Sequence, residues 1–226
     1  MMGMMLKFRN KPIAIAADVE GIFHQTRVSE DDSDSLRFLW KEDILAEAPP
    51  DVYKMLVRIF GAKDSPACAN YVLKRIARDN WMDFLPETYA TVLKDFYVDD
   101  LLKSVNTEAE AIKLAKELIE MLQRGRHRLT KFVSNSKKVL DALPQSEVSP
   151  SSSVEIDVEK LERALGIWWE TSNDVFTFVT KLKPNPPTKR GILSTTSSLF
   201  DPLGFLLPFL IVARLILQEL WRQGYD

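Results

Sequence analysis

The chain has 226 residues and a formal net charge of −2, with 46% hydrophobic and 27% charged residues. This composition is typical of a globular protein and excludes wholesale disorder. One cysteine excludes a disulfide framework, and two separated histidines exclude a structural zinc cluster. The eight glycines are too scattered for a GxGxxG or GxxxxGK phosphate loop. Because a chain with one cysteine does not depend on disulfides, we expect an intracellular protein, cytoplasmic or nuclear, that is not secreted.

Neither end of the chain predicts a targeting or membrane segment. The amino terminus reaches Lys7 and Arg9 before any small-residue cleavage site, which argues against a signal peptide. The apolar tract Leu203–Leu217 is broken by Pro208, carries Arg214 and is shorter than the roughly 20 residues of a spanning helix. We expect a buried or subunit-facing helix there, with a membrane helix as the alternative.

Hydrophobic periodicity predicts the elements along the chain. The run Ile13–Asp18 is apolar up to a final acid, which predicts a strand buried on both faces that ends at Asp18. In Phe96–Val105 two apolar arms flank Asp99 and Asp100, which predicts a hairpin with both acids at its turn. The other elements expected are strands at Leu36–Trp40 and Val52–Phe60, helices at Ser65–Asn80 and Thr107–Arg124, a hairpin of Leu165–Glu170 with Val175–Thr180, and two helices ending near Gly224.

Two of these helices have recognisable ends. Ser65 is the expected cap of the first, and Pro66 is tolerated in its first turn. Thr107 and Glu110 form a capping box for the second, and Gly125 closes it. Its expected apolar face consists of Ile112, Ala115, Leu118, Ile119 and Leu122.

The acids suggest a chemistry. A strand that ends in Asp18 and a hairpin tip with Asp99 and Asp100 supply the carboxylates that two-metal phosphoryl transfer requires, because Mg²⁺ prefers oxygen ligands. The alternative is a solvated acidic turn, since 32 acidic residues guarantee some suggestive pairs.

Several short motifs supply the context for these acids. The segment Tyr97-Val-Asp-Asp100 resembles the polymerase signature of a tyrosine, any residue and two aspartates. The others are Asp18–Gln25, which resembles the preceding palm motif; Phe60–Pro66, which resembles a template-positioning FG…SP segment; Leu129–Lys131 and Leu165–Ile167, which resemble later palm motifs; and the characteristic Arg37–Trp40 and Ser198–Gly204. Five of these motifs occur in the same order as in the reverse transcriptases of LTR retrotransposons. The sequence therefore resembles those enzymes, most closely the BEL/Pao group.

The resemblance implies a role for each matching residue. Asp18 and Asp99 would hold two Mg²⁺ ions, with Mn²⁺ as a substitute, and Asp100 would be the third metal-binding and catalytic carboxylate. Lys131 would protonate pyrophosphate or simply contact phosphate. Phe23 would be the steric gate against a 2′-hydroxyl, and a core aromatic is the alternative. The remaining implied contacts are Gly61 and Tyr97 to the nucleotide, and Ser65, Pro66, Leu165 and Gly166 to template or primer.

Local charge favours a polymer partner. Arg124–Lys138 contains six basic residues and no acid, and Lys181–Arg190 contains four more. Such patches suit the phosphates of an RNA or DNA template with its primer. Two solvated basic turns are the alternative.

The sequence also departs from the family pattern. Only seventeen residues precede Asp18, so most of the fingers region that grips the incoming dNTP would be missing, and Ile59 stands where many relatives have proline. RNase H and integrase regions of a polyprotein would be missing as well. We therefore expect a fragment with little or no polymerase activity of its own.

The expected fold is an α+β polymerase palm with an antiparallel sheet backed by helices, followed by partial thumb or connection helices. The expected divisions are a palm at residues 1–143, a flexible Ser/Pro-rich loop at 144–157, and the end of the palm with a partial thumb or connection at 158–226. A degenerate or domesticated fragment that binds nucleic acid or protein without catalysis is the main alternative. A Mg²⁺-dependent phosphohydrolase is a third, although it would need neither Phe23 nor the FG…SP segment.

Overall fold

The structure is a computed structural model, and it describes residues 2–45, 47, 49–150, 161–164, 167–177, 185–199, 201 and 204–224. The chain divides into two compact units, Lys7–Ser153 and Met1–Leu6 with Val154–Asp226, and each is described by itself. Helices and antiparallel sheets occur in the chain, so its class is α+β.

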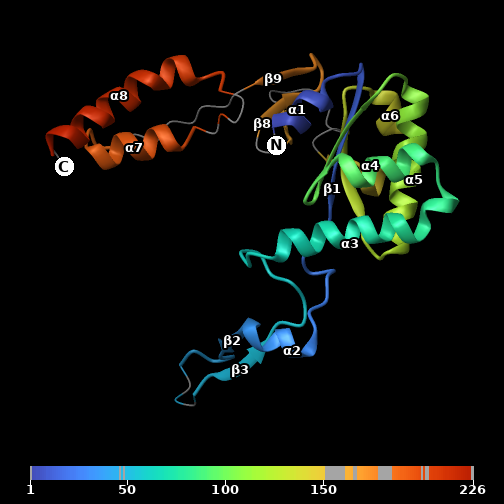
Figure 1. The fold of residues 1–226 in the computed structure, drawn as a ribbon, viewed down its shortest axis with the longest axis horizontal. Helices are drawn as coiled ribbons and strands as arrows, with labels where there is room; N and C mark the ends of the chain where they lie inside the picture. The colour runs from blue at the N-terminus through green and yellow to red at the C-terminus, as the bar shows by residue number, and fades with distance from the viewer. Residues whose placement is uncertain are drawn as a thin grey trace. The chain divides into compact units, whose positions relative to one another are not determined.

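A four-stranded antiparallel sheet forms the centre of the unit Lys7–Ser153 (Figure 1). Its strands are β1 (Ile13–Val19), β4 (Phe96–Tyr97), β5 (Asp100–Val105) and β6 (Leu129–Ser134), in the order β4-β5-β1-β6. The strand predicted at residues 13–18 and the hairpin predicted at residues 96–105 are confirmed. The central position of β1 places Asp18 between two neighbouring strands.

Helices cover one face of this sheet (Figure 1). They are α3 (Ser65–Asn80), α4 (Pro86–Lys94), α5 (Glu108–Arg124) and α6 (Lys137–Asp141). Alternate residues of β1, namely Ile15, Ala17 and Val19, belong to the core cluster that these helices complete. Because side chains alternate along a strand, Asp18 points to the opposite face of the sheet.

The two long helices follow their sequence signals closely. The helix predicted at residues 65–80 is confirmed, but its N-cap is Asp64, while the Ser65 hydroxyl donates to the carbonyl of Ile59 at 2.8 Å. The predicted cap of α5 is confirmed, since Thr107 Oγ1 accepts from the Glu110 amide at 3.2 Å. The expected apolar face of α5 is buried or partly buried, and it also includes Ala111, Leu114 and Met121.

A short hairpin follows β1 in sequence. It consists of β2 (Arg37–Trp40) and β3 (Asp51–Lys54), and every residue in both strands is exposed. The strand predicted at Val52–Phe60 is therefore too long, because pairing in β3 stops at Lys54. A single helical turn, α2 (Glu30–Ser33), and a 3₁₀ turn at Asp34–Leu36 precede the hairpin.

Other differences are short elements that the sequence analysis did not predict, and the structure of one predicted loop. The helices α1 (Met2–Phe8) and α4 were not predicted, nor was the 3₁₀ turn Trp81–Asp83. The loop predicted at residues 144–157 begins with a 3₁₀ turn, Gln145–Glu147, and the Ser149 amide donates to the Phe132 carbonyl at 3.0 Å. Residues 151–157 of that predicted loop lie outside the described residues.

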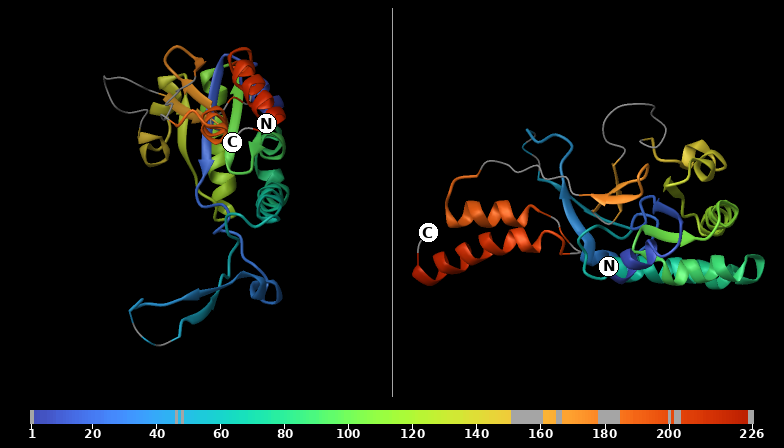
Figure 2. Two further views of the ribbon diagram at one scale, coloured as in Figure 1. Left: turned by 90° about the vertical axis from the view of Figure 1, so that its left-hand side faces the viewer. Right: turned by 90° about the horizontal axis from the view of Figure 1, so that it is seen from above.

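The described residues from 161 onward in the second unit form a three-stranded antiparallel sheet and the helices α7 (Lys189–Ser197) and α8 (Leu207–Gln223). The strands are β7 (Leu161–Ala164), β8 (Ile167–Glu170) and β9 (Val175–Thr177). The predicted hairpin of Leu165–Glu170 with Val175–Thr180 is therefore confirmed over residues 167–177, and its positions 165, 166 and 178–180 lie outside the described residues. The helices α7 and α8 lie side by side (Figure 2). Across the described ranges, no helix is both long and apolar enough to cross a membrane.

Candidate active site

Backbone pairing brings the three predicted aspartates to one place. Asp18 on β1 and Asp100 on β5 are direct cross-strand partners, and Asp99 occupies the turn that precedes β5. The Val19 amide donates to the Asp99 carbonyl at 2.9 Å, which ties the turn to β1. Directly opposed residues share a face of the sheet, with Cβ atoms about 5 Å apart. Asp18 and Asp100, 82 positions apart in sequence, thus become neighbours through the register of two strands.

The turn that carries Asp99 is strained. Val98 has a φ of 59°, a conformation that a β-branched residue rarely adopts. Its side chain is partly buried against the core, so the surrounding packing holds this conformation in place. Strain of this kind costs of order 1–3 kcal/mol and persists where the neighbouring structure imposes it. It is the type of backbone outlier that accumulates at functional sites.

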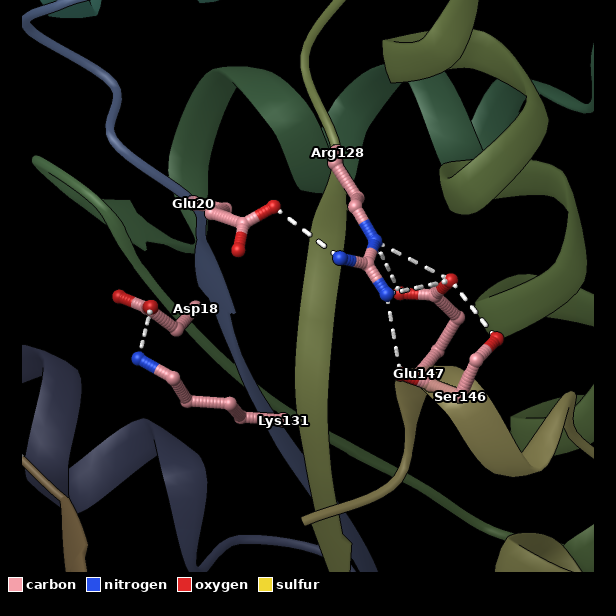
Figure 3. Close-up of polar contacts among 6 residues, drawn as sticks. All are labelled: Asp18, Glu20, Arg128, Lys131, Ser146 and Glu147. Atoms are coloured by element: carbon pink, nitrogen blue, oxygen red, sulfur yellow. Dashed lines mark hydrogen bonds and ion pairs between the residues drawn. The ribbon is translucent and has the colours of Figure 1, made fainter.

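Lys131 reaches the aspartates from the other neighbour of β1. The pairing of β1 with β6 is irregular between Ala16 and Asp18, because Lys131 and Phe132 both stand opposite Ala17. This β-bulge gives Lys131 a φ of 55° and re-aims its side chain. Its Nζ atom lies 2.8 Å from Asp18 Oδ2 (Figure 3). The lysine predicted to act near phosphate is therefore paired with a predicted metal ligand.

Burial and mutual repulsion shift the pKa values in this cluster. Burial raises the pKa of the Asp100 carboxyl to about 6, and the charges of Asp99 and Asp18 contribute to this rise while Lys131 opposes it. The pKa of Asp99 is also raised, mainly by burial, with Asp18 as an additional cause. The pKa of Lys131 is raised because its ammonium donates to Asp18. The site thus holds more negative charge than its surroundings stabilise.

These side chains do not form a metal-chelating group by themselves. Among the residues that the structure describes, no cluster of three or more histidine, cysteine, aspartate or glutamate side chains is arranged to hold a metal ion. The donor set is nevertheless the one that Mg²⁺ prefers, namely carboxylate oxygens. The residue types and their neighbourhood fit a hard cation, and the cation found there is the Lys131 ammonium.

A second polar network beside Asp18 was not predicted from the sequence. Arg128 precedes β6 and donates to the Glu147 carboxylate, with Nε–Oε2 at 3.0 Å, and to Glu20 Oε2 at 3.2 Å (Figure 3). Its guanidinium also donates to the Ser146 carbonyl at 3.1 Å. The Glu20 amide in turn donates to the Arg128 carbonyl at 2.9 Å. This network fastens the turn at residues 145–147 to the ends of β1 and β6, two residues from Asp18.

Much of the predicted basic cluster is neutralised by local acids. Arg124 pairs with Asp83 and Glu120, and its guanidinium lies 4.5 Å from the centroid of the Phe84 ring. The other pairs are Arg128 with Glu147 and Glu20, Lys131 with Asp18, and Lys138 with Glu108. These acids are close in space to the basic residues, but all of them lie outside residues 124–138 in the sequence. The positive surface that residues 124–138 offer to phosphates is therefore smaller than their composition suggests.

Phe23 lies in the core cluster. Its side chain is only 6% exposed, and its ring meets Phe60 edge-on with centroids 4.7 Å apart. Phe60 is 65% exposed and also meets the exposed His24 edge-on. This position is compatible with a core aromatic, because the ring is buried. It is also compatible with a steric gate, because the exposed Phe60 beside it places the Phe23 ring near the surface.

The other predicted contact residues are spread over several elements. Gly61 has a φ of +89°, so the backbone turn after Phe60 favours glycine, although a Cβ at this position would meet no atom within 4 Å. Ser65 is buried and Pro66 is exposed in the first turn of α3. Tyr97 is 41% exposed at the end of β4, paired with Asp100. Leu165 and Gly166 lie outside the described residues.

Comparison with known families bears on the second unit. Residues 188–226 match the family model of the Pao retrotransposon-like RNaseH-like domain. This match supports an origin of the chain in a Pao-type retrotransposon. It covers α7 and α8 and none of the residues that carry the aspartates. No curated protein matches the chain.

The description of the matched family bears on the predicted divisions of the chain. It names an RNase H-like domain, whereas the resemblance described above implies the end of a palm and a partial thumb or connection at residues 158–226, with no RNase H region. The described residues from 185 onward form two helices. The assignment of this segment to a thumb or connection stays a prediction.

Proposed function

We propose that this retrotransposon-derived chain carries an RNA-directed DNA polymerase site, a reverse transcriptase palm built on β1, β5 and β6. The observation that carries the proposal is the cross-strand pair of Asp18 and Asp100, with Asp99 at the adjoining strained turn. Its substrates would be a dNTP and the 3′-hydroxyl of a primer paired to an RNA or DNA template. The Pao-type match at residues 188–226 supports the origin of such a protein.

Each residue near the site has a defined task in this proposal. Asp18, Asp99 and Asp100 would hold Mg²⁺, which, when bound, would activate the primer hydroxyl and neutralise the triphosphate. Lys131 would donate a hydrogen bond or a proton to the departing pyrophosphate. The edge of the Phe23 ring would exclude a 2′-hydroxyl from the sugar site. Gly61 and Tyr97 would border the nucleotide, and Ser65 and Pro66 would begin the helix under the template.

A non-catalytic fragment that binds nucleic acid or protein is the second candidate function. The ion pair between Lys131 and Asp18 favours it, because this pair uses a predicted metal ligand for structure. The acids that neutralise Arg124, Arg128 and Lys138 favour a protein partner over a polyanion.

Primer extension on an RNA template separates the two candidates. The chain and a version extended upstream by a fingers region should be compared, each with Asp99→Asn. We expect Mg²⁺-dependent extension by the longer version and its loss, by at least about a hundredfold, in the variant, because the Asp99 carboxylate would hold the Mg²⁺ that the reaction requires. Glu20→Gln is the matched control, since Glu20 is a neighbouring acid engaged with Arg128. Equal extension by the Asp99→Asn variant and its parent would contradict the proposal.

A further inference from the structure

The cluster of aspartates already contains a cation of its own. Lys131 Nζ lies 2.8 Å from Asp18 Oδ2, and the charge of Lys131 also stabilises the ionised forms of Asp99 and Asp100. One ammonium is therefore paired with Asp18 and lies close enough to Asp99 and Asp100 to act on their charges. A divalent cation at the same carboxylates would experience repulsion from this ammonium, so the two cations cannot share Asp18 without cost.

The two partners of this ion pair differ in their freedom to move. Asp18 belongs to the central strand, with β5 on one side and β6 on the other, and its side chain is only 25% exposed. The Lys131 side chain is 64% exposed and leaves the sheet at a bulge. A lysine has a flexible four-carbon stem, whereas a paired strand holds its aspartate in place. The ammonium is therefore the partner that can leave.

We propose that the Lys131 ammonium occupies the place of a divalent cation on Asp18 and is displaced when the cation binds, so that Lys131 sets the metal affinity of the site. This inference rests on the proposed function and deepens it. The contact that carries it is the ion pair of Lys131 Nζ with Asp18 Oδ2, in which the ammonium takes up a carboxylate oxygen that a metal would use. The same displacement releases the ammonium into solvent, where it can meet the phosphates of a nucleotide.

Binding of MnCl₂ alone, measured by isothermal titration calorimetry on the full chain, tests this inference without any activity assay. Lys131→Met should bind Mn²⁺ about two- to fivefold more tightly than the parent chain, the range expected from losing an exposed ion pair. Lys131→Arg should keep the parent affinity or weaken it, because it keeps the positive charge. Lys137→Met, at an exposed lysine on α6, is the matched control and should leave the affinity unchanged.

A second measurement guards against a folding defect. The rise in melting temperature caused by a fixed Mn²⁺ concentration should be larger for Lys131→Met and Lys131→Gln than for the parent chain, because a tighter ligand stabilises the folded state more. Unchanged or weaker Mn²⁺ affinity in both neutral variants would overturn the inference.

Asp18→Asn separates this inference from the proposed function. If Asp18→Asn abolishes Mn²⁺ binding while the Lys131 variants match the parent chain, the metal site stands and the displacement fails. If the parent chain and Asp18→Asn bind Mn²⁺ equally, or if no variant binds it, both proposals fail. If only the Lys131 variants bind measurably, the displacement is supported in its strongest form.

Discussion

The ionised carboxylate of Asp100 lowers the stability of the folded chain, because it is partly buried beside other carboxylates. Its pKa of about 6 lies above the usual aspartate value of roughly 3.9 because of burial and neighbouring carboxylates. Between about pH 4 and 6 the folded protein therefore keeps a proton that the unfolded chain has lost. The free energy of unfolding should fall as the pH rises through this window and then level off. At neutral pH, the ionised Asp100 therefore destabilises the folded chain.

Asp100→Asn should reduce this pH dependence, and the raised pKa of Asp99 should leave a smaller one. We expect the variant to match the parent chain near pH 4 and to exceed it by about 1–2 kcal/mol at pH 7, after allowance for partial solvent access. Urea unfolding of both proteins at several pH values between 4 and 7 measures the difference. Glu20→Gln, which removes an exposed neighbouring acid, should not reproduce it. A constant difference across the whole range would show that Asp100 does not titrate in this window.

Phe23 poses a different question at the same scale, because its ring is both buried and next to the site. Phe23→Val should lower the free energy of unfolding by about 1–3 kcal/mol through lost packing. In an extension-competent version it should also raise ribonucleotide incorporation relative to deoxyribonucleotide. Denaturant unfolding and paired dNTP and rNTP assays measure the two effects. A stability loss with unchanged sugar selectivity would make Phe23 a core residue only.

At the scale of elements, the contact between α3 and α5 depends on a glycine. A Cβ on Gly125, the C-cap of α5, would lie 2.2 Å from Ile76 Cδ1 of α3. Gly125→Ala should therefore cost about 1–3 kcal/mol through overpacking. Thermal and urea unfolding measure this. Gly3→Ala is the control, since a Cβ there meets nothing within 4 Å and alanine favours a helix. Equal effects of the two substitutions would mean that Ile76 moves aside freely.

Elements with a strong local signal were predicted well. α5 has its cap, its apolar stripe and its terminal glycine in the sequence, and the strand β1 is an uninterrupted apolar run up to Asp18. α4 was missed because it has only nine residues and begins at Pro86 with no side-chain cap. β3 was predicted too long because the residues after Lys54 have side chains typical of strands. They do not continue the pairing with β2, and the sequence of one segment does not show where its pairing with another segment ends.

The candidate site could be predicted only in part for a similar reason. The hairpin with Asp99 and Asp100 is a local pattern, and its proximity to Asp18 follows once β1 and β5 pair. The ion pair of Lys131 depends on one extra residue in β6, a bulge that no local pattern announces. Arg128 pairs with Glu20 and Glu147, which lie 108 and 19 residues away in the sequence, so no local pattern predicts these contacts.

At the scale of the whole molecule, the unit Lys7–Ser153 contains its own core. The core cluster and the residues packed against it come from positions 13–148. A fragment of residues 1–153 should therefore fold, unfold cooperatively with heat and keep the pH dependence predicted for Asp100. Circular dichroism and urea unfolding check this, with the full chain as the reference. An unfolded fragment would mean that residues beyond 153 are needed to complete the first unit.

The helix α8 bears on the behaviour of the chain in solution. Its residues Leu210 and Leu217 are buried, while Phe209, Val212 and Ile216 form an exposed apolar stripe on another face, with 78%, 59% and 47% exposure. Such a stripe favours association between copies, because burying it removes apolar surface from water. The full chain should therefore show a concentration-dependent rise in mass by sedimentation velocity.

The double substitution Phe209→Gln with Ile216→Gln should reduce this association while leaving the helical signal in circular dichroism unchanged. Both side chains are exposed, so their replacement removes apolar surface without opening a cavity. Arg214→Gln is the matched control, because it changes an exposed residue of the same helix and leaves the stripe intact. The fragment 1–153, which lacks α8, should stay monomeric at the same concentrations. Identical mass distributions for the parent chain and the double variant would show that the α8 stripe does not drive association.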